Sequence, residues 1–574
     1  MIRFSTIFVF LYFTFTVHPF VDAQQIMLDD SFADWQGNAI TAFKDISGDG
    51  NTSGIDFTDV KISNDDTFLY VYFDLKKEIN LQQNNFVALY VDIDNHVSTG
   101  LNISGIGADL VYYFGPRNGK HFYGNQSISV FHNDIGLISS PTVTSHQFEV
   151  GIKRNFSTGL GTGKMGDKIR ILLMDENVAG DKAPDISGGY TYMMDNNRKF
   201  TPGPFMIQKE KKEYLRILSY NVLRDRMFLP QVASAYERVF KAINPDIIGF
   251  CEIYDNTSAQ TAAFVENILP SSGSQKWHHA ALSPDIRLVS RYPILQSRSL
   301  DGNGAFLIDL GYSKLVYIVA HLPCCENDLQ RQQEVDNIMS FLRAIRFGIS
   351  PFQVPQNTPI IISGDMNFVG QRRQPQTFMT GDIVDNGRYG PDFQPDWDDS
   401  DLKDATPLTS NTSSAFTWYN GQGTYSAGRL DYFFYTNSVM DLKNSFALWT
   451  PSMTNAQLVS SGLRKGDVED CSDHLPVVCD FLVKTNVSSV QNSDSDPDAY
   501  ITWDGEHIKV SSRKAGRLQL YDMSGKMIFD TEVAGSQIET LVSLSSIMNS
   551  DGLYLCQLVL PEKVLSRKIV FFRW

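Results

Sequence analysis

The hydrophobic pattern divides the chain into stretches of different period. Between residues 24 and 205, apolar and polar residues alternate in short runs such as Phe68–Phe73, Phe86–Val91 and Asp109–Phe114. Alternation with a period of two, interrupted by Gly, Asn and Asp, is typical of half-buried β-strands. This stretch therefore predicts a β-sandwich domain with few helices.

The middle stretch, residues 206–483, alternates apolar runs with helix-like segments. Amphipathic spacing predicts helices over Ala233–Ile243 and Arg331–Arg346. Continuous apolar runs predict buried strands, and these runs are Leu215–Tyr220, Ile247–Phe250, Leu315–Ala320 and Pro359–Ser363. Two packed β-sheets with outer helices would bring the carboxyl ends of these strands to one rim.

The last stretch, residues 500–574, is again rich in strand patterns. Residues 516–526 predict two strands joined by a turn, and Gly552–Leu555 and Lys568–Phe571 predict two more. Residues 484–499 are rich in Ser, Asp and Asn, which predicts a flexible linker. The expected order is two flanking β-sandwich domains around one α/β domain.

Residues 1–23 have the pattern of a secretory signal peptide. Arg3 precedes the mostly apolar run Ile7–Val17, and Val21-Asp22-Ala23 has small residues where signal peptidase cleaves. The alternative is a membrane anchor, but the run is shorter than the roughly 20 residues that span a bilayer. We therefore expect cleavage after Ala23 and a mature protein that is secreted or held at the cell surface, without a transmembrane segment.

Composition excludes some classes of protein. The chain has 574 residues, a net charge of −16 and six cysteines, none with Cys-x-x-Cys spacing. A structural zinc site or a disulfide scaffold is therefore not expected, and disulfide pairing cannot be read from the sequence. The negative charge argues against wrapping nucleic acid along the whole chain, but not against an enzyme that binds one phosphate through a metal ion.

Short polar motifs carry the candidate chemistry of the middle stretch. There are six such motifs, and each lies at the end of an apolar run, where we expect a strand to end and the sheet to open to solvent. In chain order the motif residues are Asn221, Glu252, His321, Asp365 and Asn367, Asp431, and Asp473 with His474.

These residue types suit the hydrolysis of a phosphoester, which needs a cation to neutralise the phosphate and a positioned water molecule. Glu252 is the candidate principal ligand of Mg²⁺, with Mn²⁺ as the alternative, because hard cations prefer carboxylate oxygens. Asn221 and Asp473 are the candidates that complete this metal site.

His474 paired with Asp431 forms a second candidate unit, because a carboxylate fixes the tautomer of an imidazole and raises its basicity. Asp365 competes with His474 for the role of general base, and the sequence does not separate them. Asn367 is expected to bind phosphate or orient water. His321 is expected to donate to a phosphate oxygen or to the leaving group.

In order and chemistry, these motifs resemble the endonuclease/exonuclease/phosphatase superfamily over about 270 residues. The resemblance implies an α/β four-layer sandwich and cleavage of phosphoesters in DNA, RNA, sphingomyelin or inositol phosphates. It also implies either water activation or transition-state stabilisation by His474 and Asp431. His321 stands where the abasic-site repair branch has Tyr, which together with export argues against intracellular DNA repair.

The substrate is less well specified than the family. Residues 211–483 carry 23 basic and 30 acidic side chains, a net −7, so no broad basic face for tight duplex binding is expected. Local phosphate contacts are predicted at Arg224, Arg226, Arg372 and Arg373, with solvated loop charges as the alternative. We rank an extracellular endonuclease first, a sphingomyelinase or phospholipase-type phosphodiesterase second, and a sugar- or inositol-phosphate phosphatase third. The non-enzyme alternative is a surface glycan-binding protein.

The flanking stretches resemble other families more loosely. Val91-Asp-Ile-Asp94, Thr99-Gly100 and Gly107-Ala-Asp109 resemble family 9 carbohydrate-binding and DOMON-like sandwiches. This resemblance implies a glycan partner. Residues 500–574 resemble the C-terminal sorting domain of type IX secretion cargo, which implies a secretion-machinery partner. The alternative there is a plain accessory β-sandwich.

One loop of the first stretch has the spacing of a calcium site. Asp45, Ser47, Asp49 and Asp56 supply oxygen at suitable positions, although the twelfth position is Asp rather than Glu and no helices flank the loop. The alternative is a turn between strands that is rich in Gly and Asp.

Overall fold

The computed structural model describes residues 25–37, 40–50, 53–203, 205–273, 276–484, 499–503, 507–522, 526–535, 540–543, 552–561 and 563–571. The chain forms two compact units, Met1–Thr485 and Asn486–Trp574. The expected signal peptide lies outside the described residues, as does the expected linker apart from its end residues Lys484 and Ala499.

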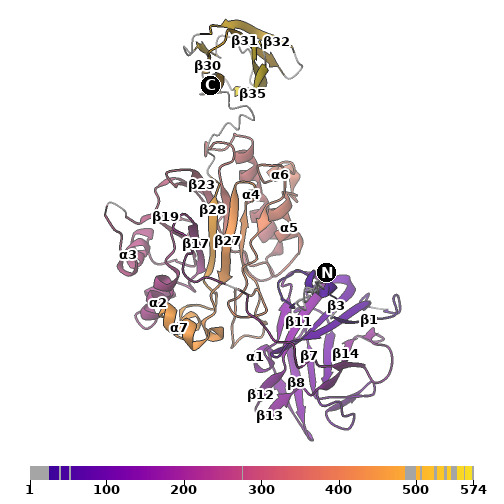
Figure 1. Ribbon diagram of the computed structural model, residues 1–574. Coiled ribbons are helices and arrows are strands. Elements are labelled where there is room, and N and C mark those ends of the chain that lie inside the picture. The colour runs from indigo at the N-terminus through magenta and orange to yellow at the C-terminus, as the bar shows by residue number, and fades with distance from the viewer. Residues whose placement is uncertain are drawn as a thin grey trace, which may run out of the picture. The chain divides into compact units, whose positions relative to one another are not determined.

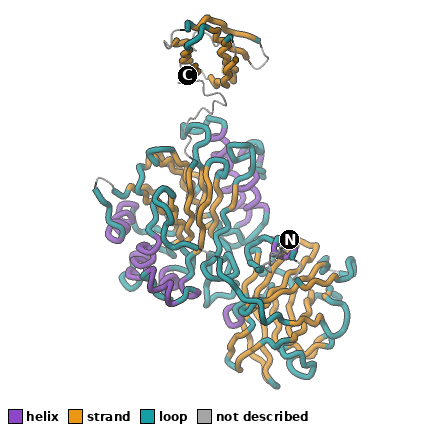
Figure 2. Tube along the Cα trace, viewed as in Figure 1, coloured by secondary structure: helices purple, strands orange, loops and turns teal. Residues whose placement is uncertain are grey.

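The first unit begins with two β-sheets, which we call the N-terminal β region (residues 25–203; Figures 1 and 2). The five-stranded sheet has the order β1 (Thr41–Lys44), β2 (Asp59–Asn64), β3 (Phe68–Ile79), β11 (Ser145–Lys153) and β10 (Ile138–Ser140). The seven-stranded sheet has the order β15 (Lys182–Ala183), β14 (Lys168–Asp175), β4 (Val87–Asp92), β7 (Leu110–Tyr113), β8 (Asn118–Tyr123) and β9 (Gln126–Val130), with β16 (Tyr190–Met193) also paired to β14. Two small hairpins are β5 (Leu101–Ile103) with β6 (Ile106–Ala108) and β12 (Asn155–Thr158) with β13 (Gly161–Lys164).

Alternate residues of both sheets meet in one core. Val71 and Phe73 of β3 share this core with Leu89 and Val91 of β4, and all four are buried. The strands predicted from alternation at residues 68–73, 86–91 and 109–114 are confirmed as β3, β4 and β7. Alternate side chains of each strand point to opposite faces, and in β4 the second face is buried too, because Ala88 and Tyr90 belong to another hydrophobic cluster.

The central region contains two six-stranded sheets. The first has the order β19 (His278–Leu282), β20 (Ile286–Ser290), β18 (Ile247–Cys251), β17 (Leu215–Asn221), β28 (Val477–Val483) and β27 (Met440–Ala447). The second has the order β21 (Ile294–Leu300), β22 (Asn303–Asp309), β23 (Lys314–His321), β24 (Ile360–Asp365), β26 (Asp431–Tyr435) and β25 (Lys403–Asp404).

Helices cover the outer faces of these two sheets (Figure 1). On the side of the first sheet lie α2 (Ala233–Ile243), α3 (Ser258–Ile268) and α7 (Asn455–Ser461), and on the side of the second lie α4 (Asp328–Arg346), α5 (Arg373–Thr380) and α6 (Asn386–Tyr389). The remaining described helices are α1 (His132–Ile135) and α8 (Asp467–Cys471), with short 3-10 turns at Asp34–Gln36, Arg226–Phe228 and Thr450–Ser452.

One core joins the facing sheets of the central region. Ile217 and Ile248 of the first sheet share it with Tyr317 and Phe433 of the second, and none of the four is exposed. The predicted helix over Ala233–Ile243 is confirmed, whereas the second helix begins at Asp328, three residues earlier than predicted. Helix, sheet, sheet and helix therefore form four layers.

Strand register places polar residues beside one another at the rim. β23 pairs parallel to β24, which sets His321 opposite Asp365, and β24 pairs antiparallel to β26, which sets Asp365 opposite Asp431. In the other sheet β17 pairs parallel to β18, which sets Asn221 opposite Cys251 and next to Glu252. The ends of both sheets thus present their polar groups together.

The second unit contains two antiparallel sheets, β29 (Ala499–Trp503), β30 (His507–Ser512) and β33 (Thr540–Ser543), and β32 (Met527–Val533), β31 (Gly516–Asp522), β34 (Gly552–Leu560) and β35 (Lys563–Phe571). Ile508 and Val510 share a core with Leu518 and Leu520, which joins the sheets. Within the described part of the chain, no helix combines the length and apolar character that crossing a membrane requires.

Candidate active site

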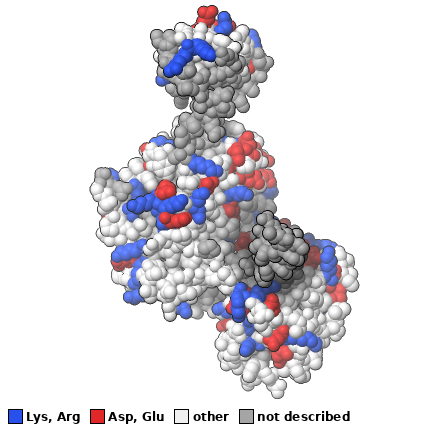
Figure 3. Space-filling view, viewed as in Figure 1, with Lys and Arg blue, Asp and Glu red and all other residues white. Residues whose placement is uncertain are grey.

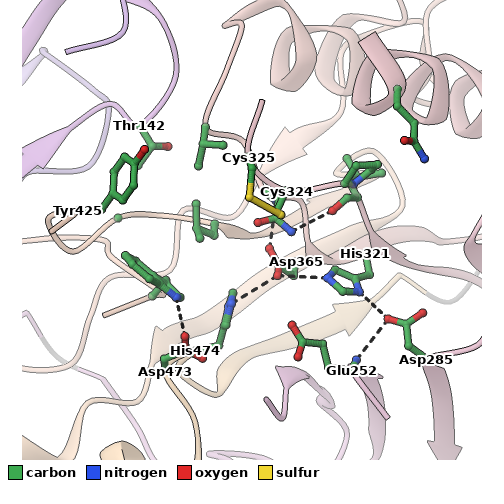
Figure 4. Close-up of a pocket in the computed structure, with 18 of the residues that line it drawn as sticks. Thr142, Glu252, Asp285, His321, Cys324, Cys325, Asp365, Tyr425, Asp473 and His474 are labelled. Atoms are coloured by element: carbon green, nitrogen blue, oxygen red, sulfur yellow. Dashed lines mark hydrogen bonds and ion pairs between the residues drawn. A yellow bond between two sulfur atoms is a disulfide. The ribbon is translucent and has the colours of Figure 1, made fainter. Parts of the chain in front are cut away.

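Asp365, the last residue of β24, lies at the centre of the site (Figure 4). Asn221 Nδ2 donates to Asp365 Oδ2 at 3.0 Å. The Nε2 atoms of His474 and His321 lie 3.4 Å and 3.7 Å from the same oxygen. Both sheets and the segment before β28 therefore contribute groups to a single carboxylate oxygen.

Glu252 follows β18 and faces the same point. Its backbone has φ +64°, the left-handed region that non-glycine residues rarely adopt, which is typical of functional sites. Asn221 Nδ2 donates to Glu252 Oε1 at 3.0 Å, and the backbone N–H of Arg224 donates to Oε2 at 3.0 Å. Ligand-type atoms of Glu252, His321 and Asp365 lie within 4.8 Å of one another.

His474 is buried and oriented by Asp431. Its Nδ1 lies 2.8 Å from Asp431 Oδ2, and the Asp431 backbone N–H donates to Thr417 Oγ1 at 2.8 Å. Burial alone would lower the pKa of His474, but the negative charges of Asp431 and Asp365 outweigh it and raise this pKa to about 10. With Nδ1 held by Asp431, Nε2 is the ring atom that faces Asp365.

His321 has a carboxylate partner that the sequence did not reveal. Its Nδ1 lies 2.5 Å from Oδ2 of Asp285, a buried residue between β19 and β20. Burial opposes a charged His321, yet the hydrogen bond to Asp285 and the charge of Asp365 raise its pKa to about 9. The only sequence signal for Asp285 is its place in the turn Ser283-Pro284-Asp285 before an apolar run.

Asp473 and Asn367 complete the set of predicted motif residues. Trp418 Nε1 donates to Asp473 Oδ2 at 3.0 Å, while the buried Oδ1 of Asp473 has no hydrogen-bond partner among the described residues. Asn367 Nδ2 donates to the Leu322 carbonyl at 2.9 Å, and its backbone N–H donates to Asp365 Oδ1 at 3.0 Å. Asn367 thus fixes the loop behind Asp365.

Most of these groups line one cavity of about 650 Å³, whereas Asn221 and Asp431 are not among its lining residues. Of the four predicted phosphate-contacting arginines, only Arg224 lines it, whereas Arg226 Nε donates to the Asp470 carbonyl at 2.9 Å. A disulfide between the neighbouring residues Cys324 and Cys325 also lines the cavity (Figure 4). We call this cavity the active-site pocket.

The donor set fits a divalent cation. Glu252 and Asp365 offer hard carboxylate oxygens within reach of one another, and Oδ1 of Asp473 is a buried oxygen without a partner among the described residues. The pocket also carries the carboxylate of Asp285, so its lining is strongly acidic. A phosphate group would be repelled from such a lining unless a cation neutralised part of the charge.

The predicted calcium loop joins β1 to β2 and is only partly assembled as expected. Asp45 and Asp49 converge with Asp181 rather than with Asp56, their ligand atoms lying within 4.8 Å. Asp56 instead accepts hydrogen bonds from the Gly48 N–H and from Lys76 Nζ, the latter at 3.0 Å. The Ser47 hydroxyl likewise accepts from Lys76. Burial, with the negative charges of neighbouring aspartates, raises the pKa of Asp45 to about 7.

The charge distribution on the surface agrees with the composition. In Figure 3, basic and acidic side chains lie together in a band across the central region, acidic ones gather at its upper right, and much of the lower part of this face is uncharged. Within the pocket, Arg224 is the one arginine or lysine among the lining residues that the structure describes. Binding through a local metal centre is therefore better supported by this surface than binding through a basic face.

Comparison with known proteins identifies the central region. Residues 218–474 match the endonuclease/exonuclease/phosphatase family, and they form a domain of this family. This confirms the resemblance expected for the middle stretch. No curated protein matches the chain.

The chain is also similar to several solved structures. The human Nocturnin catalytic domain with bound sulfate anion is 16% identical, with 47% of this chain and 95% of that chain covered and a TM-score of 0.30. D. rerio TDP2 complexed with single strand DNA product is 16% identical, with 47% and 98% covered and a TM-score of 0.29. ANGEL2, a 2',3'-cyclic phosphatase, is 14% identical, with 47% and 95% covered and a TM-score of 0.32.

Proposed function

We propose that the central region is a divalent-metal-dependent phosphodiesterase that cleaves nucleic acid as an endonuclease, with Mg²⁺ or Mn²⁺ as its cofactor. The observation that carries this proposal is the convergence of Asn221, His321 and His474 on one oxygen of Asp365, beside Glu252. Family membership of residues 218–474 supports phosphoester hydrolysis as the reaction class.

Glu252 and Asp365 would hold the cation, with Asn221 keeping their carboxylates in place and Asp473 offering a further oxygen. When bound, such a cation neutralises phosphate charge and makes water more acidic. Since the two carboxylates come from different sheets, the packing of those sheets sets the geometry of this centre.

The His474–Asp365 pair would take the proton from the attacking water. His474 is oriented for this by Asp431, and its Nε2 lies 3.4 Å from Asp365 Oδ2, so a proton can be shared between the two groups. His321, held by Asp285, would donate a hydrogen bond to a phosphate oxygen or protonate the leaving oxygen. Arg224 is placed to contact phosphate at the edge of the pocket.

Hydrolysis of bis(p-nitrophenyl) phosphate and of oligonucleotides by the whole mature chain tests the proposal. We expect turnover with Mg²⁺ or Mn²⁺ that disappears with EDTA and in His474→Ala, while the exposed control His279→Ala retains it. A folded, metal-supplied protein that hydrolyses neither substrate contradicts the proposal. Hydrolysis of the small diester alone would contradict the nucleic-acid substrate and favour phospholipid or sugar-phosphate esters.

The flanking regions suggest where the enzyme is located and what else it binds. The sequence patterns of residues 1–23 and 500–574 support export and sorting to the cell surface, and the pattern around Asp92 and Asp109 supports a glycan partner for the N-terminal β region. The convergence of Asp45, Asp49 and Asp181 supports a calcium ion there. Comparing the secreted and cell-bound fractions of the chain with and without residues 500–574 tests the sorting proposal.

A further inference from the structure

The N-terminal β region forms part of the active-site pocket. Four of its residues line the pocket together with Asp365 and His474, and these are Asn80, Gln82, Gln83 and Thr142. All four side chains are polar and uncharged. Thr142 lies beside Tyr425, across the pocket from His321 and Asp285 (Figure 4).

This region also holds the loop that follows Asp365, residues 366–372, which we call the Asp365 loop. Thr142 Oγ1 donates to the Phe368 carbonyl at 2.7 Å, and Asn80 Nδ2 donates to the Val369 carbonyl at 2.7 Å. The backbone N–H of Thr144 donates to the Gly370 carbonyl at 2.7 Å. Three successive carbonyls of the Asp365 loop are therefore bound by the N-terminal β region.

The N-terminal β region also holds a second loop. We call residues 419–428 the glycine-rich loop. It begins after Trp418, whose side chain donates a hydrogen bond to Asp473, and leads to the short segment before Asp431. Asn133 Nδ2 donates to the Gly421 carbonyl at 2.6 Å, and His132 Nε2 donates to the Gly423 carbonyl at 3.1 Å. A loop with three glycines and no regular structure would have high conformational entropy without such partners.

The far end of the glycine-rich loop is bound by residues that themselves line or border the pocket. Gln82 Oε1 accepts from the Ser426 backbone N–H at 2.9 Å, and Gln83 Nε2 donates to the Tyr425 hydroxyl at 3.3 Å. The guanidinium of Arg117 lies 4.2 Å from the centre of the Tyr425 ring. Because Tyr425 is 39% exposed and lines the pocket, these contacts fix an aromatic surface at its rim.

The chemistry of this wall differs from that of the metal centre. Its amide and hydroxyl side chains can exchange hydrogen bonds with neutral groups of a substrate. They carry no positive charge that could bind the phosphates of a second nucleic-acid strand. The edges of unpaired bases offer such neutral groups, whereas in a duplex the Watson–Crick edges are already occupied. The cavity volume of about 650 Å³ lies in the range typical of pockets that bind one small molecule.

We infer that the N-terminal β region is a positioning and specificity element of this active site, which fixes the Asp365 and glycine-rich loops and selects single-stranded over double-stranded nucleic acid. The inference rests on the proposed phosphodiesterase function. Thr142 donates its single hydroxyl hydrogen to the Phe368 carbonyl at 2.7 Å, with the Arg429 carbonyl, just after the glycine-rich loop, 3.4 Å away, and is therefore a positioning residue. Gln82 and Gln83 form the wall that faces the substrate.

Steady-state kinetics of the whole mature chain test both roles, with bis(p-nitrophenyl) phosphate and with one oligonucleotide supplied as a single strand or a duplex. We expect the single strand to be cleaved with a kcat/KM at least about tenfold higher than the duplex. Thr142→Val, which removes one hydroxyl, should lower kcat for the small diester about tenfold with little change in KM, because small misplacements of catalytic groups are costly. Thr142→Ser should restore kcat, and the exposed control Lys164→Ala should match the wild type.

Gln83→Ala tests the wall directly. It should raise KM for the single strand and reduce its advantage over the duplex. Equal cleavage of single strand and duplex by the wild type, or an unchanged kcat in folded Thr142→Val, overturns the inference and leaves the phosphodiesterase proposal standing. No hydrolysis of the small diester by the metal-supplied wild type removes both.

Discussion

The carboxylate of Asp431 orients the ring of His474 and stabilises its protonated form. Asp431 is fully buried, its Oδ2 is bound to His474 Nδ1, and its Oδ1 has no hydrogen-bond partner among the described residues. Asp431→Asn keeps the shape but replaces the carboxylate with a neutral amide, which lowers the pKa of His474 and weakens the hydrogen bond that orients its ring. We expect kcat for bis(p-nitrophenyl) phosphate to fall about 100-fold or more.

Asp382→Asn, an exposed change on the same domain, is the matched control for Asp431→Asn and should retain the wild-type kcat. A melting temperature close to that of the wild type would show that the loss is chemical rather than structural. Wild-type kcat in Asp431→Asn would contradict the role given to the His474–Asp431 pair.

Asp34 predicts a pH dependence of stability away from the active site. Its Oδ2 accepts from the Met27 N–H at 2.7 Å, its Oδ1 is buried without a partner among the described residues, and burial raises its pKa to about 6. The folded state therefore binds a proton that the unfolded state releases, and this contribution to stability is lost as pH rises through about 6. A pKa shift of this size corresponds to a change of about 1–3 kcal/mol in the free energy of unfolding between low and high pH.

Urea unfolding of the wild type and Asp34→Asn at pH 5 and pH 7.5 measures this contribution. Asp29 and Glu149 also titrate nearby, so the difference between the two proteins isolates Asp34. We expect Asp34→Asn to be the more stable protein at pH 7.5 and the advantage to shrink at pH 5. An advantage that grows toward low pH would contradict the assignment.

At the scale of single elements, the packing of β24 against β23 sets the distance between Asp365 and His321. Gly364 has φ +142°, and a Cβ there would lie 1.9 Å from the Ala320 carbonyl oxygen. Gly364→Ala should therefore cost about 2–4 kcal/mol of unfolding free energy and abolish hydrolysis. Urea unfolding measures the first effect and the diester assay the second.

Gly311→Ala is the matched control for Gly364→Ala. Gly311 also has a positive φ, +84°, but a Cβ there meets nothing within 4 Å. The cost at Gly311 should be about 1 kcal/mol, which is the cost of backbone conformation without a clash. Equal costs at the two glycines would contradict the importance of close strand packing at the rim.

The elements that the sequence predicted are those with strong local patterns. Apolar runs marked β17, β18, β23 and β24, so the hydrophobic pattern was enough to place Asn221, Glu252, His321 and Asp365 at strand ends. The prediction that every motif ends its strand is wrong for Asp431, which begins β26, and for Asp473 and His474, which precede β28. Their antiparallel strands bring them to the same rim, which local periodicity does not reveal.

Contacts between residues far apart in the chain could not be predicted from the sequence. Asp285 lies in a short turn, and its pairing with His321 depends on how the two sheets face each other. The calcium loop failed in the same way, because Asp181, far along the chain, takes the place expected of Asp56. The spacing of ligands along the sequence predicts a metal site only when a single loop supplies all of the ligands.

At the scale of the whole first unit, the N-terminal β region and the central region are joined by a partly buried ion pair. Arg429 is 5% exposed, donates to Asp404, and lies 3.9 Å from Oδ2 of Asp30 in the N-terminal β region. Arg429→Met would leave two partly exposed carboxylates without this charged partner, at a cost of about 1–3 kcal/mol. Because Asp30 and Asp404 belong to different regions, we expect both to unfold in one transition at a lower urea midpoint.

Adding Asp404→Asn to Arg429→Met should recover part of that loss, since one unpaired charge is removed. Two separate transitions in the wild type, one for residues 25–203 and one for the central region, would contradict the view that these regions form one unit.

The central claim is that Glu252 and Asp365 hold a divalent cation used in phosphoester hydrolysis. The most direct test is the rate of bis(p-nitrophenyl) phosphate hydrolysis as a function of free Mg²⁺ or Mn²⁺, in the wild type and in Glu252→Gln. We predict saturable activation in the wild type and at least about a tenfold weaker metal response in Glu252→Gln. A rate that does not depend on the metal, or an identical metal response in the two proteins, would contradict the claim.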